Sequence, residues 1–358
     1  MQRRGLKMEP MERLSSAFTR FATTLAAGIV VLAASFQACA NDDSDARVEA
    51  ILNAVVGLRA IVPETARTAW SLGTQREGSG IVIDDNGMVL TIGYLILEAS
   101  DVEVTNAEGD FVAAELVAYD YDSGFGLVRA KRSLGLEGIS LGTSSELEPG
   151  DAALIVAHIG PDYMRPAQVA DIREFPGYWE YLLDHAIFTT PPFQGFGGAA
   201  LINTDGKLVG VGSLIVNDAF RGVQQRPGNM FVPIDLLKPI MEDLVANGRD
   251  TTKKRPWLGV YTAMNRGHLF VSRVAIGGPA ETGGIRRNDI IVAVNGNSVS
   301  DMADFLRQVW ATGPAGSDVE ISVLRDGAVK NVVVESADRY DWLNLKPPSQ
   351  FTAMAQID

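Results

Sequence analysis

The chain has 358 residues, of which 46% are apolar and 21% charged, a composition that excludes a mainly disordered chain, a collagen and a coiled coil. Its formal net charge is −13, and an acidic surface repels phosphate backbones, so we expect no nucleic-acid partner. The single cysteine excludes an intrachain disulfide framework and a CxxC metal site. The sequence has three histidines, none of them at short ligand spacing, and we expect neither a metal site nor a cofactor.

Residues 1–40 have the pattern of an export signal. A basic stretch is followed by an apolar run from Phe21 to about Phe36 and then by Ala38-Cys39-Ala40. The run is shorter than the ~20 residues that span a bilayer, which favours a signal peptide cleaved after Ala40. A lipoprotein signal with Cys39 lipidated and an uncleaved N-terminal anchor are the other two interpretations. All three predict a periplasmic or otherwise extracytoplasmic protein that meets a membrane only through this segment.

Short strands with tight turns dominate the chain as far as residue 233. Apolar spacing first predicts a short amphipathic helix over residues 45–58. GIVIDDNGMVLTI then predicts two strands around an Asp-Asn-Gly turn, and similar patterns recur at 8–12 residue intervals. The absence of long helices between the strands disfavours a doubly wound α/β fold and favours an antiparallel barrel or sandwich.

The remaining sequence predicts a second, smaller unit. Residues 234–246 have a helical pattern despite Pro239, and residues 247–256 read as a polar linker that ends in proline. From residue 257 to about 338, five strand candidates and the helical stretches PAETGG and SDMADFLRQVW form a compact domain. Residues 339–358 show no periodicity and predict a mobile tail.

Two sets of motifs resemble the HtrA/Deg family of trypsin-like serine proteases with a C-terminal PDZ domain. The PDZ resemblance rests on RPWLGV, GGPAETGGIRRNDIIVAVNGNSV and VEISVLRDG. The protease resemblance rests on GSGIVIDDNGMVLTIGYLI, VAYDYDSGFGLVRA, LGTSSELEPGDAALIVA and GFGGAALINTDGKLVGV. It covers about residues 50–337 and implies a mainly β protein. A degenerate trypsin-like double antiparallel β-barrel would span residues 45–246, and an α+β PDZ domain would span residues 257–338.

The resemblance also places the three catalytic positions of the family, which need a nucleophilic hydroxyl, a base and a carboxylate. The TNxHV segment that carries the histidine has Tyr94 here, and the DLAVL-like strand begins with Gly124 in place of the aspartate. The GNSGGPL segment has Gly197 in place of the serine. A phenol with a pKa near 10 is a poor base at neutral pH, and glycine supplies neither hydroxyl nor carboxylate. We therefore expect no catalytic residues.

An active site built from other residues is the alternative. Asp120 and Asp122 lie shortly before the aspartate position, and either could turn inward. A base would have to be His158, His185 or His268, and the pattern places none of these in the segment where the family has its histidine. In that alternative the chain is an HtrA-type serine endopeptidase of envelope protein quality control with a non-standard site.

The resemblance implies a peptide site in the PDZ domain. Such domains add a peptide as an extra strand and hold its C-terminal carboxylate with the backbone N–H groups of a loop. In that loop a glycine lets the backbone approach the ligand. The helix SDMADFLRQVW would form the second wall of the groove, with some of its apolar side chains turned to the core. The predicted peptide-binding residues are Trp257, Leu258, Gly259, Val260 and Phe305.

Together these features predict a catalytically inactive HtrA-like pseudoprotease of the cell envelope. Its partners would be peptide C-termini or unfolded segments. By binding them, the protein would act as a scaffold, a chaperone-like holder or a regulator. Because family members commonly assemble through the barrel domain, the resemblance also implies a homotrimer or a hetero-oligomer with an active relative.

Overall fold

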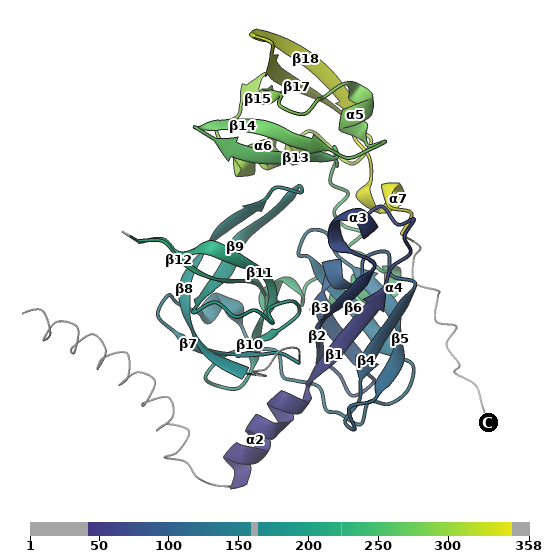
Figure 1. The fold of residues 1–358 in the computed structure, drawn as a ribbon, viewed down its shortest axis with the longest axis vertical. Helices are drawn as coiled ribbons and strands as arrows, with labels where there is room; N and C mark the ends of the chain where they lie inside the picture. Colours follow the sequence, from purple (N-terminus) through teal and green to yellow (C-terminus); the bar gives the residue numbers. More distant parts are fainter. Residues whose placement is uncertain (1–41, 159–163, 223, 346–358) are drawn as a thin grey trace, which may run out of the picture. The chain divides into compact units, whose positions relative to one another are not determined.

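A computed structural model of the chain describes residues 42–158, 164–222 and 224–345 (Figure 1). The predicted export signal lies outside these residues. Both barrels and the C-terminal domain belong to one compact unit, which begins at Ile51. None of the helices in the described part is long and apolar enough to cross a membrane.

The first barrel forms from the alternating sequence after residue 54. Its strands close in the order β1-β2-β3-β6-β5-β4. Their bounds are β1 Val55–Ile61, β2 Gln75–Val82, β3 Met88–Ile92, β4 Asp101–Thr105, β5 Phe111–Tyr119 and β6 Phe125–Ala130, with the short helices α3 Ala69–Leu72 and η1 Gly93–Leu95. The predicted Asp-Asn-Gly turn joins β2 to β3, where the Asp84 carboxylate accepts hydrogen bonds from the backbone N–H groups of Asn86 and Met88.

The predicted helix over residues 45–58 is too long at its C-terminal end. Helix α2 spans Asp42–Asn53, and β1 begins at Val55. Val55, Val56 and Leu58 are buried in the barrel core, where β-branched side chains pack well on a pleated sheet. Burial in the sheet therefore overrides the helical spacing of these residues.

The second barrel closes in the order β10-β11-β12-β9-β8-β7. Its elements are η2 Ser144–Glu146, β7 Ala152–Val156, β8 Met164–Gly177, β9 Tyr181–Thr190, β10 Ala200–Ile202, β11 Leu208–Phe220 and β12 Arg226–Pro233. β8 and β9 form a long hairpin (Figure 1), paired from Gln168 with Thr190 to Gly177 with Tyr181. Residues 178–180 form the turn of this hairpin.

The helix predicted over residues 234–246 is interrupted. A 3₁₀ turn, η3, spans Ile234–Leu236, and helix α4 begins only at Met241 and ends at Asn247. Pro239 has no backbone N–H and obstructs the preceding turn, so a continuous helix cannot pass through it. Gly248 ends α4 in the left-handed conformation, which glycine adopts without steric cost.

The C-terminal domain is one antiparallel sheet with two helices. Its strands run in the order β13-β14-β15-β17-β18, so β13 lies at an edge, and β16 pairs with β15. The bounds are β13 Val260–Asn265, β14 His268–Val274, α5 Pro279–Gly283, β15 Ile290–Val294, β16 Asn297–Ser298, α6 Met302–Ala311, β17 Asp318–Arg325 and β18 Ala328–Glu335. Asp301 caps α6 by accepting a hydrogen bond from the N–H of Asp304.

The predicted tail begins with a short packed helix. Helix α7 spans Arg339–Trp342, and the Tyr340 hydroxyl donates a hydrogen bond of 3.0 Å to the carbonyl of Tyr119 in the first barrel. The Trp342 ring lies 4.5 Å from the Trp257 ring. These aromatic contacts hold residues 339–345, a segment too short for periodicity to reveal. Residues 346–358 of the predicted tail lie outside the described part.

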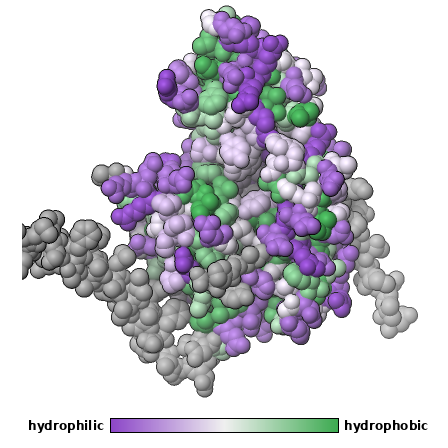
Figure 2. Space-filling model, viewed as in Figure 1, coloured by the Kyte–Doolittle hydropathy of each residue, from purple (hydrophilic) through white to green (hydrophobic). Residues whose placement is uncertain are grey.

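On the face shown in Figure 2, hydrophilic residues predominate, and apolar residues are dispersed in small patches between them. The large apolar side chains are mostly inside the three domains, with Phe125, Phe188, Phe231 and Phe305 fully buried. One core cluster joins residues of both barrels, a second lies within the second barrel, and a third fills the C-terminal domain.

A buried ion pair joins two segments of the C-terminal domain. The Asp289 carboxylate, 1% exposed, accepts two hydrogen bonds of 2.6 Å from the Arg325 guanidinium and one of 2.7 Å from the N–H of Arg286. Burial raises the pKa of Asp289, but these hydrogen bonds outweigh burial and leave the pKa below its usual value. Because the folded-state pKa is depressed, the stabilisation is present above the unfolded pKa of ~3.9 and is lost as pH falls through the folded value.

We predict that Asp289→Asn lowers the free energy of unfolding of the C-terminal domain by about 3 kcal/mol at pH 7, because it leaves Arg325 without its buried carboxylate. The difference from the wild type should shrink below about pH 4. Urea unfolding of the full chain followed by tryptophan fluorescence measures both. Asp326→Asn is the control, since Asp326 is exposed and has a φ of 53° that asparagine tolerates. Equal stability of the two variants at pH 7 would contradict the prediction.

Candidate functional site

The structure brings Tyr94 and Gly197 together. Tyr94 lies in η1, directly after β3 of the first barrel, and its hydroxyl donates a hydrogen bond of 3.0 Å to the carbonyl of Ser213 in the second barrel. A Cβ atom added to Gly197 would lie 3.1 Å from the Tyr94 hydroxyl oxygen. Two of the positions singled out in the sequence therefore face each other from different barrels.

Gly124, the third position, lies next to them through its backbone. Its carbonyl accepts a hydrogen bond of 2.7 Å from the N–H of Gly93, the residue before Tyr94. Gly124 has a φ of +82°, and an added Cβ would lie 3.2 Å from the Tyr181 hydroxyl. A side chain here would be strained by the backbone conformation, so this loop is shaped for glycine and not for a carboxylate.

The chemistry available at these positions is narrow. Burial raises the pKa of Tyr94 well above its usual value, so the phenol stays protonated at neutral pH and cannot accept a proton. Its oxygen is already held by a backbone carbonyl, and Gly197 offers no hydroxyl beside it. Tyr94 is therefore a hydrogen-bonded, neutral group at neutral pH.

The glycine loop around Gly197 is held against the first barrel by its backbone. The N–H of Ser79 donates a 2.8 Å hydrogen bond to the Gly197 carbonyl, and the N–H of Gly198 donates one of 2.9 Å to Gly212. A Cβ at Gly198, where φ is +75°, would lie 2.0 Å from the Ser79 carbonyl oxygen. Glycine at residue 198 is therefore required by the close approach of two backbones.

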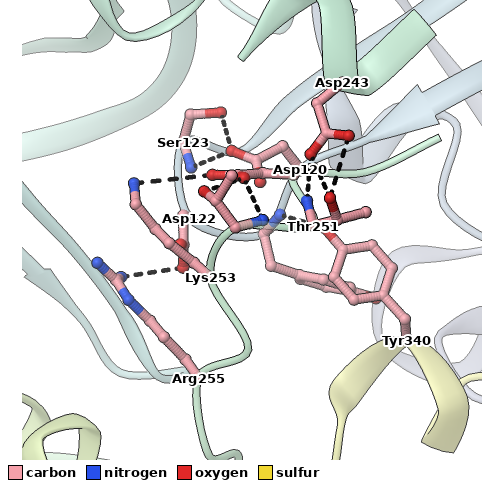
Figure 3. A network of polar contacts seen from close by, with 11 residues as sticks. Asp120, Asp122, Ser123, Asp243, Thr251, Lys253, Arg255 and Tyr340 are labelled. Carbon is pink, nitrogen blue, oxygen red and sulfur yellow. Dashed lines mark hydrogen bonds and ion pairs between the residues drawn. The ribbon is translucent and has the colours of Figure 1, made fainter. Parts of the chain in front are cut away.

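The two candidate carboxylates before Gly124 have other partners (Figure 3). Asp120 accepts hydrogen bonds from the Ser123 N–H at 2.8 Å and the Ser123 hydroxyl at 2.5 Å. Asp122 pairs with Arg255 at 2.9 Å, while burial raises its pKa to about 6. Both carboxylates are part of a polar network, in which the Asp122–Arg255 ion pair joins the predicted linker to the first barrel.

The same network holds the start of that linker. The hydroxyl of Thr251 lies 2.8 Å from the Asp243 carboxylate on α4, and Lys253 lies 3.8 Å from Asp250 (Figure 3). Asp250 is buried and accepts hydrogen bonds from Thr252. Residues 247–256 are thus bonded along their length, a property that polar composition alone does not indicate.

The three histidines lie in separate places. The backbone N–H of His158 donates a 2.9 Å hydrogen bond to the buried Ser79 hydroxyl, and its imidazole packs against Gly57. His185 is exposed on β9, and His268 is exposed at the start of β14 in the C-terminal domain. The described residues contain no group of three histidine, cysteine, aspartate or glutamate side chains that could hold a metal ion.

The backbone of the predicted peptide loop binds a carboxylate. The backbone N–H groups of Leu258, Gly259 and Val260 converge on one carboxylate, that of Glu180, at 3.0, 2.6 and 2.8 Å. Gly259 has a φ of +78°, which turns successive N–H groups to the same side. Trp257 pairs its backbone with Ala337 and is buried.

Phe305 is fully buried in the core of the C-terminal domain, together with Leu306 and Val309 of α6. Its role in peptide binding stays a prediction. Glu180, in contrast, was not among the residues that the motifs single out. It lies at a hairpin turn 78 residues before Leu258, and no local signal in the sequence links the two.

Comparison with known proteins finds two separate matches, one in the barrel region and one in the C-terminal domain. Residues 78–211 match the family model for a trypsin-like peptidase domain, and residues 256–335 match that for a PDZ domain. The chain thus combines a trypsin-like peptidase domain with a C-terminal PDZ domain, the arrangement of HtrA proteins. The expected fold, a trypsin-like double barrel followed by an α+β PDZ domain, is thereby confirmed.

Several curated HtrA proteins are similar over most of this chain. A probable periplasmic serine endoprotease DegP-like of Ectopseudomonas mendocina is 28% identical over 285 residues, which are 73% of this chain and 57% of the relative. The putative serine protease HhoA of Synechocystis is 29% identical over 73% of this chain and 70% of the relative. The periplasmic serine endoprotease DegP of Escherichia coli is 28% identical over 72% and 56%. The chain thus spans little more than half the length of the DegP relatives.

A solved structure has the same fold. The HtrA-type protease AlgW with a decapeptide aligns with a TM-score of 0.51 at 21% identity, covering 82% of this chain and 98% of AlgW. At this identity the likeness concerns the fold.

We predict that Tyr94→Phe lowers the free energy of unfolding by about 1–2 kcal/mol, because the buried Ser213 carbonyl loses its donor between the two barrels. Thermal and urea unfolding of the full chain measure the change. Tyr178→Phe removes a hydroxyl from a side chain that is 57% exposed and should have almost no effect. A Tyr94→Phe variant as stable as this control would show that the bond between the barrels contributes nothing.

Proposed function

We propose that this HtrA-family protein is a catalytically inactive binder of peptide C-termini or unfolded segments. The observation that carries the proposal is the contact of Tyr94 with Gly197 and the Ser213 carbonyl, at the positions where the family has its base and its nucleophile. Acyl transfer needs a hydroxyl that loses its proton to a neighbouring base, and this pair supplies neither.

The PDZ domain supports the binding half of the proposal. Three converging N–H groups after Trp257 form a site for a carboxylate, and β13 beside them is a sheet edge to which a strand can be added. AlgW has been solved with bound peptides. By likeness, the same class of ligand is proposed for this chain.

The place and partners of the protein follow by analogy. Relatives are named periplasmic, which agrees with the export pattern of residues 1–40 and supports a location in the cell envelope. There the protein would act as a scaffold, a chaperone-like holder or a regulator. A homotrimer or a hetero-oligomer with an active relative would bring its PDZ domain close to protease subunits.

An active serine endopeptidase is the second candidate function. The names of the relatives favour it, and His158 lies beside the buried Ser79 hydroxyl. In this candidate the imidazole would reach a serine after a local rearrangement, because the contact in the structure uses the backbone N–H of His158.

One assay separates the two. Purified full chain is incubated with unfolded casein and, separately, with a fluorophosphonate probe that labels activated serines, with an active HtrA protease as positive control. We expect no labelling and cleavage at least ~10⁴-fold below the control, because base and nucleophile are both missing. Labelling that disappears in Ser79→Ala would establish the endopeptidase instead. Labelling that persists in this variant would place an active serine elsewhere and also contradict the inactive assignment.

We predict that Gly259→Ala weakens peptide binding at least ~10-fold when it is made together with Glu180→Gln, which removes the carboxylate that already accepts the same three N–H groups. Alanine disfavours the +78° φ that aligns these groups, and its Cβ would lie 3.1 Å from that of Ala275. Fluorescence polarisation with a peptide bearing a free C-terminal carboxylate measures the affinity. Gly267→Ala together with Glu180→Gln is a matched control, since Gly267 has a φ of +79° and open space around it. Equal affinities of the two variants would contradict a role for the loop.

A further inference from the structure

The carboxylate site of the PDZ domain is already occupied by a residue of the protease-like domain. Glu180 lies at the turn of the β8–β9 hairpin, and its carboxylate accepts hydrogen bonds from all three backbone N–H groups of residues 258–260. The residue is 8% exposed. In a PDZ complex the group in this position is the terminal carboxylate of the bound peptide, so the Glu180 side chain stands where a ligand's C-terminus would be.

The backbone of the hairpin turn also follows the path of a ligand. The N–H of Thr262 on β13 donates a hydrogen bond of 3.1 Å to the carbonyl of Tyr178, two residues before Glu180. Strand addition predicts such a bond, because alternate residues of an edge strand direct their N–H groups towards the added strand. Carboxylate and backbone together therefore occupy two consecutive subsites of the groove.

The side chains of the hairpin contact both walls. Leu182 packs against the apolar core of the PDZ domain, and the Tyr178 ring lies 6.3 Å from that of Tyr261 on β13. Arg307 of α6, the opposite wall, forms ion pairs with Asp184 at 2.8 Å and with Glu174. The hairpin thus lies between the edge strand and the helix.

We propose that residues 178–182 are an internal ligand of the PDZ groove and that a peptide C-terminus binds only by displacing them. The inference rests on the proposed function, in which this domain takes peptides. It adds that the domain is closed in the resting protein, so that the measured affinity is the intrinsic affinity multiplied by the fraction of molecules in which the groove is open.

The internal contact has features that make it exchangeable. Glu180 holds a φ of 59°, a left-handed conformation that costs free energy in a residue with a Cβ. Burial raises the pKa of Glu180, while the hydrogen bonds from the three N–H groups and the charge of Arg339 lower it. Keeping the ionised carboxylate in this buried position therefore carries a desolvation cost. A peptide terminus brings the same charge to the same donors without the strained turn.

The occupied subsites also indicate the class of competing ligand. It would end in a free carboxylate, with an apolar last side chain in the place of Leu182 and an aromatic side chain near Tyr261, in the place of Tyr178. A fluorescein-labelled heptapeptide that ends in Tyr-Trp-Leu is a direct probe, and its C-terminal amide is the matched control peptide.

The test compares full-length wild type with Glu180→Gln and Glu180→Gly. Glutamine removes the charge, and glycine also removes the strain at the positive φ, so the hairpin can fold in at least one of them. We expect both variants to bind the free-carboxylate probe at least ~10-fold more tightly than the wild type and to leave the amide weakly bound. Glu335→Gln, an exposed substitution on β18, should bind as the wild type does.

Hydrogen exchange without peptide provides the second readout. The amides of residues 258–260 and 262 should exchange faster in the Glu180 variants than in the wild type, because their acceptor is lost or freed. Unchanged exchange overturns the proposal whatever the peptide does. Faster exchange with unchanged peptide affinity overturns the competition alone. Faster exchange with no peptide bound by any variant overturns the proposed peptide function, while the internal contact stands.

Discussion

Barrel closure is the constraint on which the rest of this structure depends. Each of the two barrels is a ring of six antiparallel strands, so the backbone N–H and C=O groups of each sheet are bonded without a free edge. Closure brings the end of β3 in one barrel and the loop before β10 in the other face to face. Tyr94 and Gly197 meet because two independent rings hold them, not because of any local preference of their own segments.

The same closeness leaves little room for larger side chains at this junction. Gly198 tolerates no side chain because its backbone lies against Ser79, and Gly124 has a backbone conformation that suits glycine. The Tyr94 hydroxyl donates a hydrogen bond from the first barrel to the second, so this side chain is part of the packing between them. Tyr94 and the glycine loop at residues 197–198 thus help to hold the two barrels together.

The PDZ sheet differs from the barrels in that it keeps an edge. The β13 strand and the loop before it present N–H groups that need acceptors, because a buried unpaired donor is costly. The hairpin turn at residues 178–180 supplies those acceptors from the neighbouring domain. In the proposed function a peptide C-terminus uses the same N–H donors as this intramolecular contact, so whichever carboxylate is bound excludes the other.

Much of this protein could be read from its sequence because the informative patterns are local. Turn residues such as Asp84, alternating apolar strands and the PDZ motif each depend on a few consecutive residues, and they sufficed to predict the double barrel and the PDZ domain. Local patterns were wrong where long-range packing overrode them, as at Val55–Leu58, or where a single proline interrupted a helix, as at Pro239. Only the tertiary structure could bring Glu180 to Gly259 or Tyr340 to Tyr119, because these contacts join residues far apart in the chain and arise from closure and docking, for which no short run of residues carries a signal.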